Sequence, residues 1–121
     1  MSTTVTDLRR SMGDTGEALA ARLLEDRGMT VVARNTRTRY GEIDLVCRDG
    51  SGYVFVEVKT RSPRSFVSPV EALDRRKIAR LFRLAQSWLA ARGERAAPFR
   101  VVLAAVTASA ADSAVAFIDL E

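Results

Sequence analysis

The sequence predicts an α/β fold, a single domain in which two helices flank a mixed five-stranded sheet in the order α-β-β-β-α-β-β. Two segments repeat apolar residues at helical spacing, and five others are short and rich in β-branched residues. The 121 residues suffice for one hydrophobic core and contain no repeat, low-complexity tract or interdomain linker. We expect a flexible leader over residues 1–12 and the domain over residues 13–121.

The first predicted elements are a helix and a short strand. The helix spans Gly13–Arg27, carries apolar residues at Ala20, Leu23 and Leu24, and ends at Gly28. A β-rich run follows over Met29–Arg34. The polar, basic residues after it, NTRTR, are predicted to be a connection rather than a strand.

The middle of the chain predicts a hairpin followed by a long helix. Two strands, Tyr40–Arg48 and Tyr53–Arg61, enclose the turn-forming residues DGSG. Val70–Arg92 has a broad apolar face, and we expect Trp88 on that face to be a core residue. Two β-rich runs, FRVVLAAVTA and AVAFIDLE, end the domain.

The composition excludes several kinds of chemistry. The chain has no histidine, which removes catalytic triads and histidine-ligated metals, and its one cysteine, Cys47, forms no internal disulfide. We expect Cys47 to be a buried core residue. No apolar stretch is long enough to cross a membrane, and the N-terminus lacks a secretory signal, so we expect a cytoplasmic location and no membrane partner.

The net charge is +4, and only two of the 19 basic residues, Lys59 and Lys77, are lysines. A positive charge is compatible with a phosphate-rich partner. Where arginine is used almost everywhere, a retained lysine suggests a position that needs a compact ammonium, with coding bias as the alternative.

Charged residues alternate with apolar ones along the first hairpin strand. An ideal strand places Glu42 and Asp44 on one face and Ile43 and Leu45 on the other. In the second strand, Glu57 and Lys59 share one face, opposite three valines, Val54, Val56 and Val58. Pairing of the two strands therefore brings Asp44, Glu57 and Lys59 together.

This charged group has two interpretations. It is either a functional site or the solvated face of an amphipathic hairpin, with Glu57 and Lys59 as exposed partners. The apolar run from Val54 to Val56 favours a central strand covered on both sides, in which buried charges are costly and need a compensating role.

Several linked motifs resemble a known family. GEIDLV, VFVEVKTR and the helix PVEALDRRKIARLFRLAQSWL look like the YraN-like family of the restriction-endonuclease-like PD-(D/E)XK superfamily. The likeness begins at GDTGEALAARLLEDRGMTVVARNTR and covers Gly13 to Leu89. One departure is Val67, where the family usually has glycine, and it concerns the shape of that loop rather than the metal site.

The resemblance implies the restriction-endonuclease-like fold and a metal-dependent endonuclease that hydrolyses DNA, acting in DNA repair or recombination. Carried over by position, the metal-binding acidic residue is Asp44, and the (D/E)XK element supplies Glu57 and Lys59 as further catalytic residues. Glu17 matches the extra acidic residue of relatives that resolve Holliday junctions, which suggests a branched DNA substrate. The implied cofactor is Mg²⁺ or Mn²⁺.

These residue types suit that chemistry. Asp44 and Glu57 offer hard oxygen ligands to the cation, and Lys59 would orient or help to deprotonate a water, or neutralise developing charge. Glu17 would be a further catalytic and metal-binding residue, or would simply favour the helix dipole. Glu42 is either an accessory residue of the site or the partner of an arginine.

Basic residues near the predicted strand ends are candidates for nucleic-acid binding, with a solvated basic rim as the alternative. They are Arg34, Arg37, Arg39, Arg61, Arg64 and, from the second helix, Lys77. The same helix carries further arginines, Arg75, Arg76, Arg80 and Arg83, that would line a nucleic-acid groove or keep the outer face soluble.

Two other functions stay open at this point. One is a non-catalytic nucleic-acid-binding module that retains the nuclease fold. The other is an interaction subunit of a DNA-processing complex, with protein partners or a homodimer formed through the apolar C-terminal strands. The charged residues Asp44, Glu57 and Lys59 argue against a decayed site, because an inactive fold is free to lose costly charges.

Overall fold

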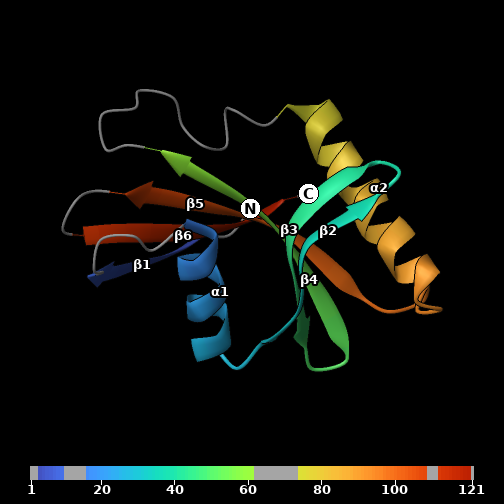
Figure 1. Cartoon of the computed structure of the whole chain (residues 1–121), viewed down its shortest axis with the longest axis horizontal. Helices are drawn as coiled ribbons and strands as arrows, with labels where there is room; N and C mark the ends of the chain where they lie inside the picture. Colours follow the sequence, from blue (N-terminus) through green and yellow to red (C-terminus); the bar gives the residue numbers. More distant parts are fainter. Residues whose placement is uncertain (1–2, 10–15, 62–73, 109–111, 121) are drawn as a thin grey trace.

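A computed structural model places one mixed β-sheet between two helices (Figure 1). It describes residues 3–9, 16–61, 74–108 and 112–120. The elements are β1 (Thr3–Arg9), α1 (Gly16–Asp26), β2 (Thr30–Thr38), β3 (Gly41–Asp49), β4 (Gly52–Arg61), α2 (Arg75–Ala91), β5 (Phe99–Ala108) and β6 (Asp112–Leu120). From α1 to β6 the order is the predicted α-β-β-β-α-β-β, which confirms the α/β fold class.

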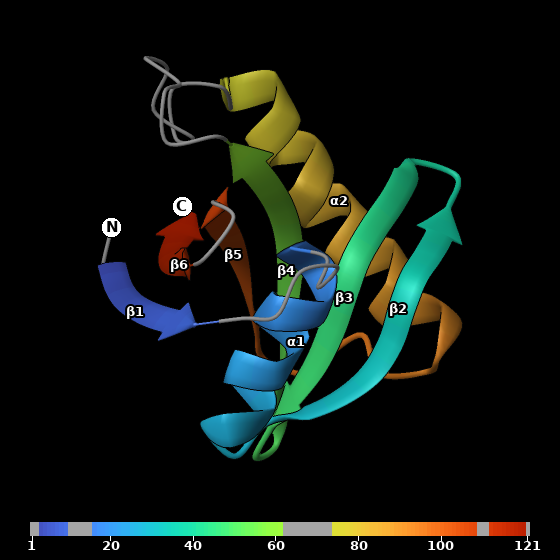
Figure 2. The same cartoon turned by 60° about the vertical axis from the view of Figure 1, so that its left-hand side comes forward.

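The strands lie in the order β1-β6-β5-β4-β3-β2. All neighbouring strands are antiparallel except β4 and β5, which are parallel from Tyr53–Phe99 to Arg61–Thr107. A parallel pair needs a long crossover connection, and α2 lies within it. Figure 2 shows α1 in front of the sheet and α2 behind it, so a helix covers each face.

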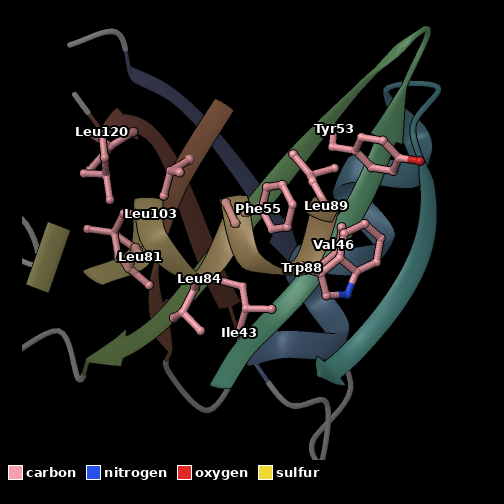
Figure 3. Packing of buried hydrophobic residues seen from close by; sticks show 14 residues of the cluster. Ile43, Val46, Tyr53, Phe55, Leu81, Leu84, Trp88, Leu89, Leu103 and Leu120 are labelled. Carbon is pink, nitrogen blue, oxygen red and sulfur yellow. The ribbon is translucent and has the colours of Figure 1, made fainter. Parts of the chain in front are cut away.

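Alternation along β4 divides the core between the two faces. Val54 and Val56 pack with α1, whereas Tyr53 and Phe55 pack with α2 (Figure 3). The prediction that Trp88 is a core residue is confirmed, because only 8% of its surface is exposed and its ring meets Phe55 edge to face, with 5.6 Å between centroids. These contacts make β4 the central strand predicted from its apolar run.

Cys47 is fully buried in the α1-side cluster, as the sequence predicted. Burial and, to a smaller extent, the charge of Glu25 raise the pKa of its thiol to about 11, and the charge of Arg34 opposes both. The reactive thiolate is therefore disfavoured, which is the behaviour of a structural cysteine.

The helix ends follow local chemistry. Helix α2 begins after Asp74, whose carboxylate accepts a hydrogen bond of 2.9 Å from the Lys77 N–H. After α1, Gly28 has a φ of 91°, which favours glycine. The earlier predicted starts, Gly13 and Val70, lie outside the described residues. Neither described helix is long and apolar enough to cross a membrane.

The sheet contains one strand more than predicted. Thr3–Arg9, placed by the sequence in a leader outside the sheet, forms β1 and pairs antiparallel with β6 from Thr3–Ile118 to Arg9–Asp112. The segment forms a strand for two physical reasons. It is rich in β-branched Thr and Val, and without it β6 would end the sheet with an unpaired edge.

Strand β2 is longer than predicted, because the polar residues after Arg34 continue it to Thr38. A register shift between Val31 and Ala33 and the left-handed backbone of Asn35, with φ 49°, accommodate this irregular strand. Arg39 and Tyr40 alone then form the turn to β3. The NTRTR segment is therefore mostly strand, and its arginines are displayed on a sheet edge.

Phe55→Ala should lower the free energy of unfolding by about 3–5 kcal/mol, because it empties a site that is fully buried beside Trp88. Urea denaturation followed by circular dichroism measures this change. The matched control is Val32→Ala, at an exposed position of β2, which should cost less than about 1 kcal/mol. Equal effects of the two substitutions would contradict the assigned core.

Candidate active site

The candidate site lies where β3 and β4 part. Their pairing runs from Asp49–Gly52 to Leu45–Val56, and Asp44 and Glu57 are the next residues on the two strands. There the Asp44 Oδ2 accepts a hydrogen bond of 2.7 Å from the Val58 N–H. A side chain of β3 thus binds the main chain of β4, which fixes the Asp44 carboxylate at this position.

The regular alternation predicted for β3 is interrupted at this residue. Ile43 was expected to share a face with Leu45, but Ile43 packs in the α2-side cluster and Leu45 in the α1-side cluster. The change coincides with Asp44 turning to the β4 backbone. Two-residue periodicity therefore holds on either side of Asp44 but does not extend through it.

Glu57 and Lys59 lie on the α2 side of β4. Val54 and Val56 belong to the α1-side cluster and Val58 packs against it, so the predicted division of β4 into a valine face and a charged face is confirmed. The Lys59 Nζ lies 4.0 Å from the Glu57 Oε2, and the side chains are 35% and 19% exposed. Both are partly shielded from solvent yet accessible.

Electrostatics distinguish Glu57 from an ordinary surface glutamate. Burial, a hydrogen bond with Asp44 and the charge of Asp44 together raise its pKa to about 7, against the opposing charges of Lys59 and Arg80. Glu57 therefore gains or loses its proton near neutral pH, well above the usual range of a glutamate. Arg80, from α2, adds a second positive charge beside the two carboxyl groups.

Glu17 reaches the same region from α1, on the other face of the sheet. Its Oε1 accepts a hydrogen bond of 3.2 Å from the Nδ2 of Asn35, which falls opposite Asp44 in the β2–β3 register. Gly16 brings the helix close to β4, because a Cβ at this position would collide with the Thr60 Oγ1. The first turn of α1 is thus held beside the site.

Gly16, Asn35 and Thr60 were not predicted as site residues, and Arg80 was predicted only as one of several helix arginines. An asparagine within a β-rich stretch is a signal for a left-handed backbone, but the Glu17 contact depends on tertiary packing. The Gly-Glu pair that opens α1 was visible in the sequence, although the close approach of Gly16 to β4 was not.

The remaining candidates are dispersed. Glu42 forms an ion pair of 3.3 Å with Arg37, which is the structural alternative that the sequence left open for it. Arg34 acts on Cys47 rather than on Glu57, and Arg39 lies in the β2–β3 turn. Arg61 ends β4, Lys77 lies in the first turn of α2, and Arg64 is outside the described residues.

Two carboxyl groups, those of Asp44 and Glu57, are therefore the residues that could hold a cation here. In the described part of the chain, no three carboxylate or thiol side chains converge as a metal-binding group. Glu17 is thus near the pair but is not gathered with it. A hard cation such as Mg²⁺ is compatible with two carboxylates, because it completes its shell with water and substrate oxygen.

Comparison with known proteins gives a consistent match over this region. The sequence model of the uncharacterised protein family UPF0102 matches residues 16–106, which include α1, β2 to β4, α2 and most of β5. A UPF0102 protein of Beutenbergia cavernae is 49% identical over 104 residues, which cover 86% of this chain and 88% of the relative.

Two further UPF0102 proteins show the same level of similarity. That of Streptomyces griseus is 53% identical over 81 residues, covering 67% of this chain and 68% of the relative. That of Moorella thermoacetica is 48% identical over 89 residues, covering 74% of each. The similarity therefore extends over most of the chain and is not confined to one motif.

Glu57→Gln should remove part of the pH dependence of stability. A carboxyl whose folded pKa is about 7, above its ordinary 4.5, contributes stability that is fully present below 4.5 and is lost as the pH rises through 7. Urea denaturation in EDTA should show the wild-type protein losing more stability between pH 5 and pH 8 than the variant. No histidine titrates in this interval.

The matched control is Glu25→Gln, at an exposed glutamate of α1. It should retain the wild-type slope of stability against pH. The interpretation of Glu57 fails if Glu57→Gln and Glu25→Gln have the same slope.

Proposed function

We propose that this chain, which belongs to the uncharacterised protein family UPF0102, is a Mg²⁺- or Mn²⁺-dependent nuclease that hydrolyses phosphodiester bonds in DNA. The observation that carries the proposal is the convergence of Asp44, Glu57 and Lys59 where β3 and β4 part. Two neighbouring carboxyl groups, with the Lys59 ammonium 4.0 Å from Glu57, form a site suited to a divalent cation and a phosphate.

The donor set fits a hard cation. Asp44 is held in place by the Val58 N–H, so little further ordering is needed for binding. Glu57 would release its proton on binding a positive ion. When bound, the cation supplies Lewis-acid stabilisation of phosphoryl charge and makes a water more acidic.

The residues of the chain then have separable tasks. Asp44 and Glu57 would hold the cation where β3 and β4 part, through their negative charge. Lys59 provides an ammonium beside Glu57 that can hold the attacking water or neutralise charge on the phosphate. Arg80 contributes additional positive charge from α2, which favours the approach of an anionic substrate.

The choice of DNA is supported by the resemblance of GEIDLV and VFVEVKTR to PD-(D/E)XK nucleases and by the net charge of +4. The finer proposal, a branched or otherwise structured DNA substrate, is supported by Glu17. Its match to resolvase relatives and its hydrogen bond to Asn35, opposite Asp44, are consistent with an accessory role at the site.

Purified protein should cut DNA with Mg²⁺ or Mn²⁺ and not with EDTA. Asp44→Asn, Glu57→Gln and Lys59→Met should each lower the rate at least about 100-fold, because each removes a charge required at the reacting phosphate. The assay compares linear duplex, single-stranded and four-way-junction DNA by gel electrophoresis. Asp26→Asn, an exposed carboxylate at the end of α1, is the control that should retain activity.

Different outcomes separate the alternatives. Cutting that persists in Asp44→Asn and Lys59→Met would refute the proposed site. The absence of cutting with every cation, together with salt-dependent DNA binding, would instead support the non-catalytic binding module. If four-way junctions are cut no faster than linear duplex, the proposal of a branched substrate is refuted, whereas the proposal of a nuclease is not.

Mn²⁺ should raise the melting temperature of the wild-type protein at pH 8. Saturation at 100 times the Kd stabilises a folded protein by about 2.7 kcal/mol, and Asp44→Asn should remove the effect. The shift should be smaller at pH 5.5, where Glu57 keeps its proton. Differential scanning fluorimetry tests this directly, and an equal shift in Asp44→Asn would place the cation elsewhere.

A further inference from the structure

A pocket of about 470 Å³ lies between the β2–β3 turn, the outer side of α2 and the start of β5. Among the residues that line it are three arginines, two aromatic residues and a serine: Arg39, Arg83, Arg95, Tyr40, Phe99 and Ser87. A second pocket, of about 420 Å³, shares Arg39 and Ser87 with the first and adds Arg37 and Arg92. The two pockets therefore adjoin, and among the described residues no carboxylate lines either of them.

Within the described part of the chain, no carboxylate is paired with the arginines of the first pocket. Two arginines of the described surface are paired with carboxylates, Arg37 with Glu42 and Arg100 with Asp49 and Asp119. Among the residues that the structure describes, Arg83 and Arg95 form no ion pair, and both are exposed. Guanidinium groups gathered without carboxylates suit phosphate groups, which they bind through two parallel hydrogen bonds.

The aromatic residues of the pocket indicate which kind of phosphate-bearing molecule it fits. The Tyr40 ring lies under the Arg39 guanidinium, 4.9 Å from centroid to carbon, and its hydroxyl accepts a hydrogen bond of 2.8 Å from Arg39. Phe99 is half-buried against Phe55 and Phe82. Cationic grooves with aromatic side chains are typical of sites for single-stranded nucleic acid, in which unstacked bases lie on the rings.

The pocket is separate from the carboxylate site but leads to it. None of Asp44, Glu57 and Lys59 lines the pocket. Arg80 acts on Glu57, and Arg83, one turn further along α2, lines the pocket. One helical turn advances about 5 Å, so positive charge continues along α2 from the site into the pocket.

We propose that this pocket binds the phosphates and an unstacked base of a single-stranded nucleic-acid segment and leads that strand along α2 to Asp44 and Glu57. The destination of the strand rests on the proposed nuclease function, whereas its binding does not. Arg83 and Arg95 hold phosphates, and Tyr40 provides the surface on which a base stacks. The pocket thus selects substrates that expose a single strand.

The test is fluorescence anisotropy with a labelled oligothymidylate of roughly 16 nucleotides, free or paired with its complement, in EDTA and in the Asp44→Asn background. Arg83→Gln/Arg95→Gln should weaken single-strand binding at least tenfold. It should also reduce the slope of log affinity against log salt by about 0.7 for each lost phosphate contact. Tyr40→Leu should weaken single-strand binding at least fivefold and leave duplex binding unchanged.

Arg22→Gln is the matched control, because it removes an exposed arginine from α1 on the opposite face of the sheet, and it should bind as the parent does. Arg83→Lys/Arg95→Lys should restore most of the salt slope, which a folding defect would not allow. Wild-type affinity in Arg83→Gln/Arg95→Gln, or equal losses for both DNA forms in Tyr40→Leu, would overturn the proposal.

The binding measurement does not depend on nuclease activity, because it is made in EDTA and in the Asp44→Asn variant, which is designed not to cleave. Weakened binding in the arginine variants would support the pocket even if the wild-type protein cut no DNA. Conversely, the wild-type protein could cut DNA with metal while the arginine variants keep their affinity for single strands. That outcome would support the proposed nuclease and refute the proposed binding role of the pocket.

Discussion

The hydrogen bond between the Val58 N–H and the Asp44 carboxylate is the constraint on which the site depends. Strands that stay paired leave no room for a ligand between them, whereas strands that part expose backbone groups that need partners. Asp44 meets that need for β4 with its own side chain. The same bond orients the carboxylate toward Glu57, so one interaction both ends the pairing and begins the site.

The site is also held by packing on two sides. Immediately before it, Phe55 and Val56 are fully buried, one under each helix. The charged side chains therefore extend from the most rigid part of the sheet, which keeps their positions defined. An elevated pKa at Glu57 means that the folded protein holds an unfavourable charge above neutral pH, and this is a common cost of functional carboxylates.

Much of the fold was predictable because periodicity reports local structure. The helices and the strands from β2 to β6 follow from spacing and turn residues, and alternation in β4 placed Glu57 and Lys59 on one face. The sequence did not reveal β1, because an edge strand is defined by the partner that accepts it. The full length of β2 was not predicted, because its polar residues pair with β3 at the edge of the sheet and do not fill the core.

The site itself was predictable in part. Resemblance and alternation named Asp44, Glu57 and Lys59, and the structure brings them together. Alternation failed at Ile43, because the side chain of Asp44 competes there with the regular backbone ladder. Contacts that bridge distant segments, such as Arg80 with Glu57 and Glu17 with Asn35, follow from tertiary packing and have no local signal.

The parallel pairing of β4 with β5 has a kinetic consequence. Glu57 faces Leu103 across this pair, and the two strands can meet only after the whole connection through α2 has closed into a loop. Such non-local pairing is slow, because the entropy of closure is lost before any contact compensates for it. A growing chain on the ribosome would therefore complete the sheet beside Asp44, Glu57 and Lys59 only after β5 has been synthesised, long after the β3–β4 hairpin that carries them has emerged.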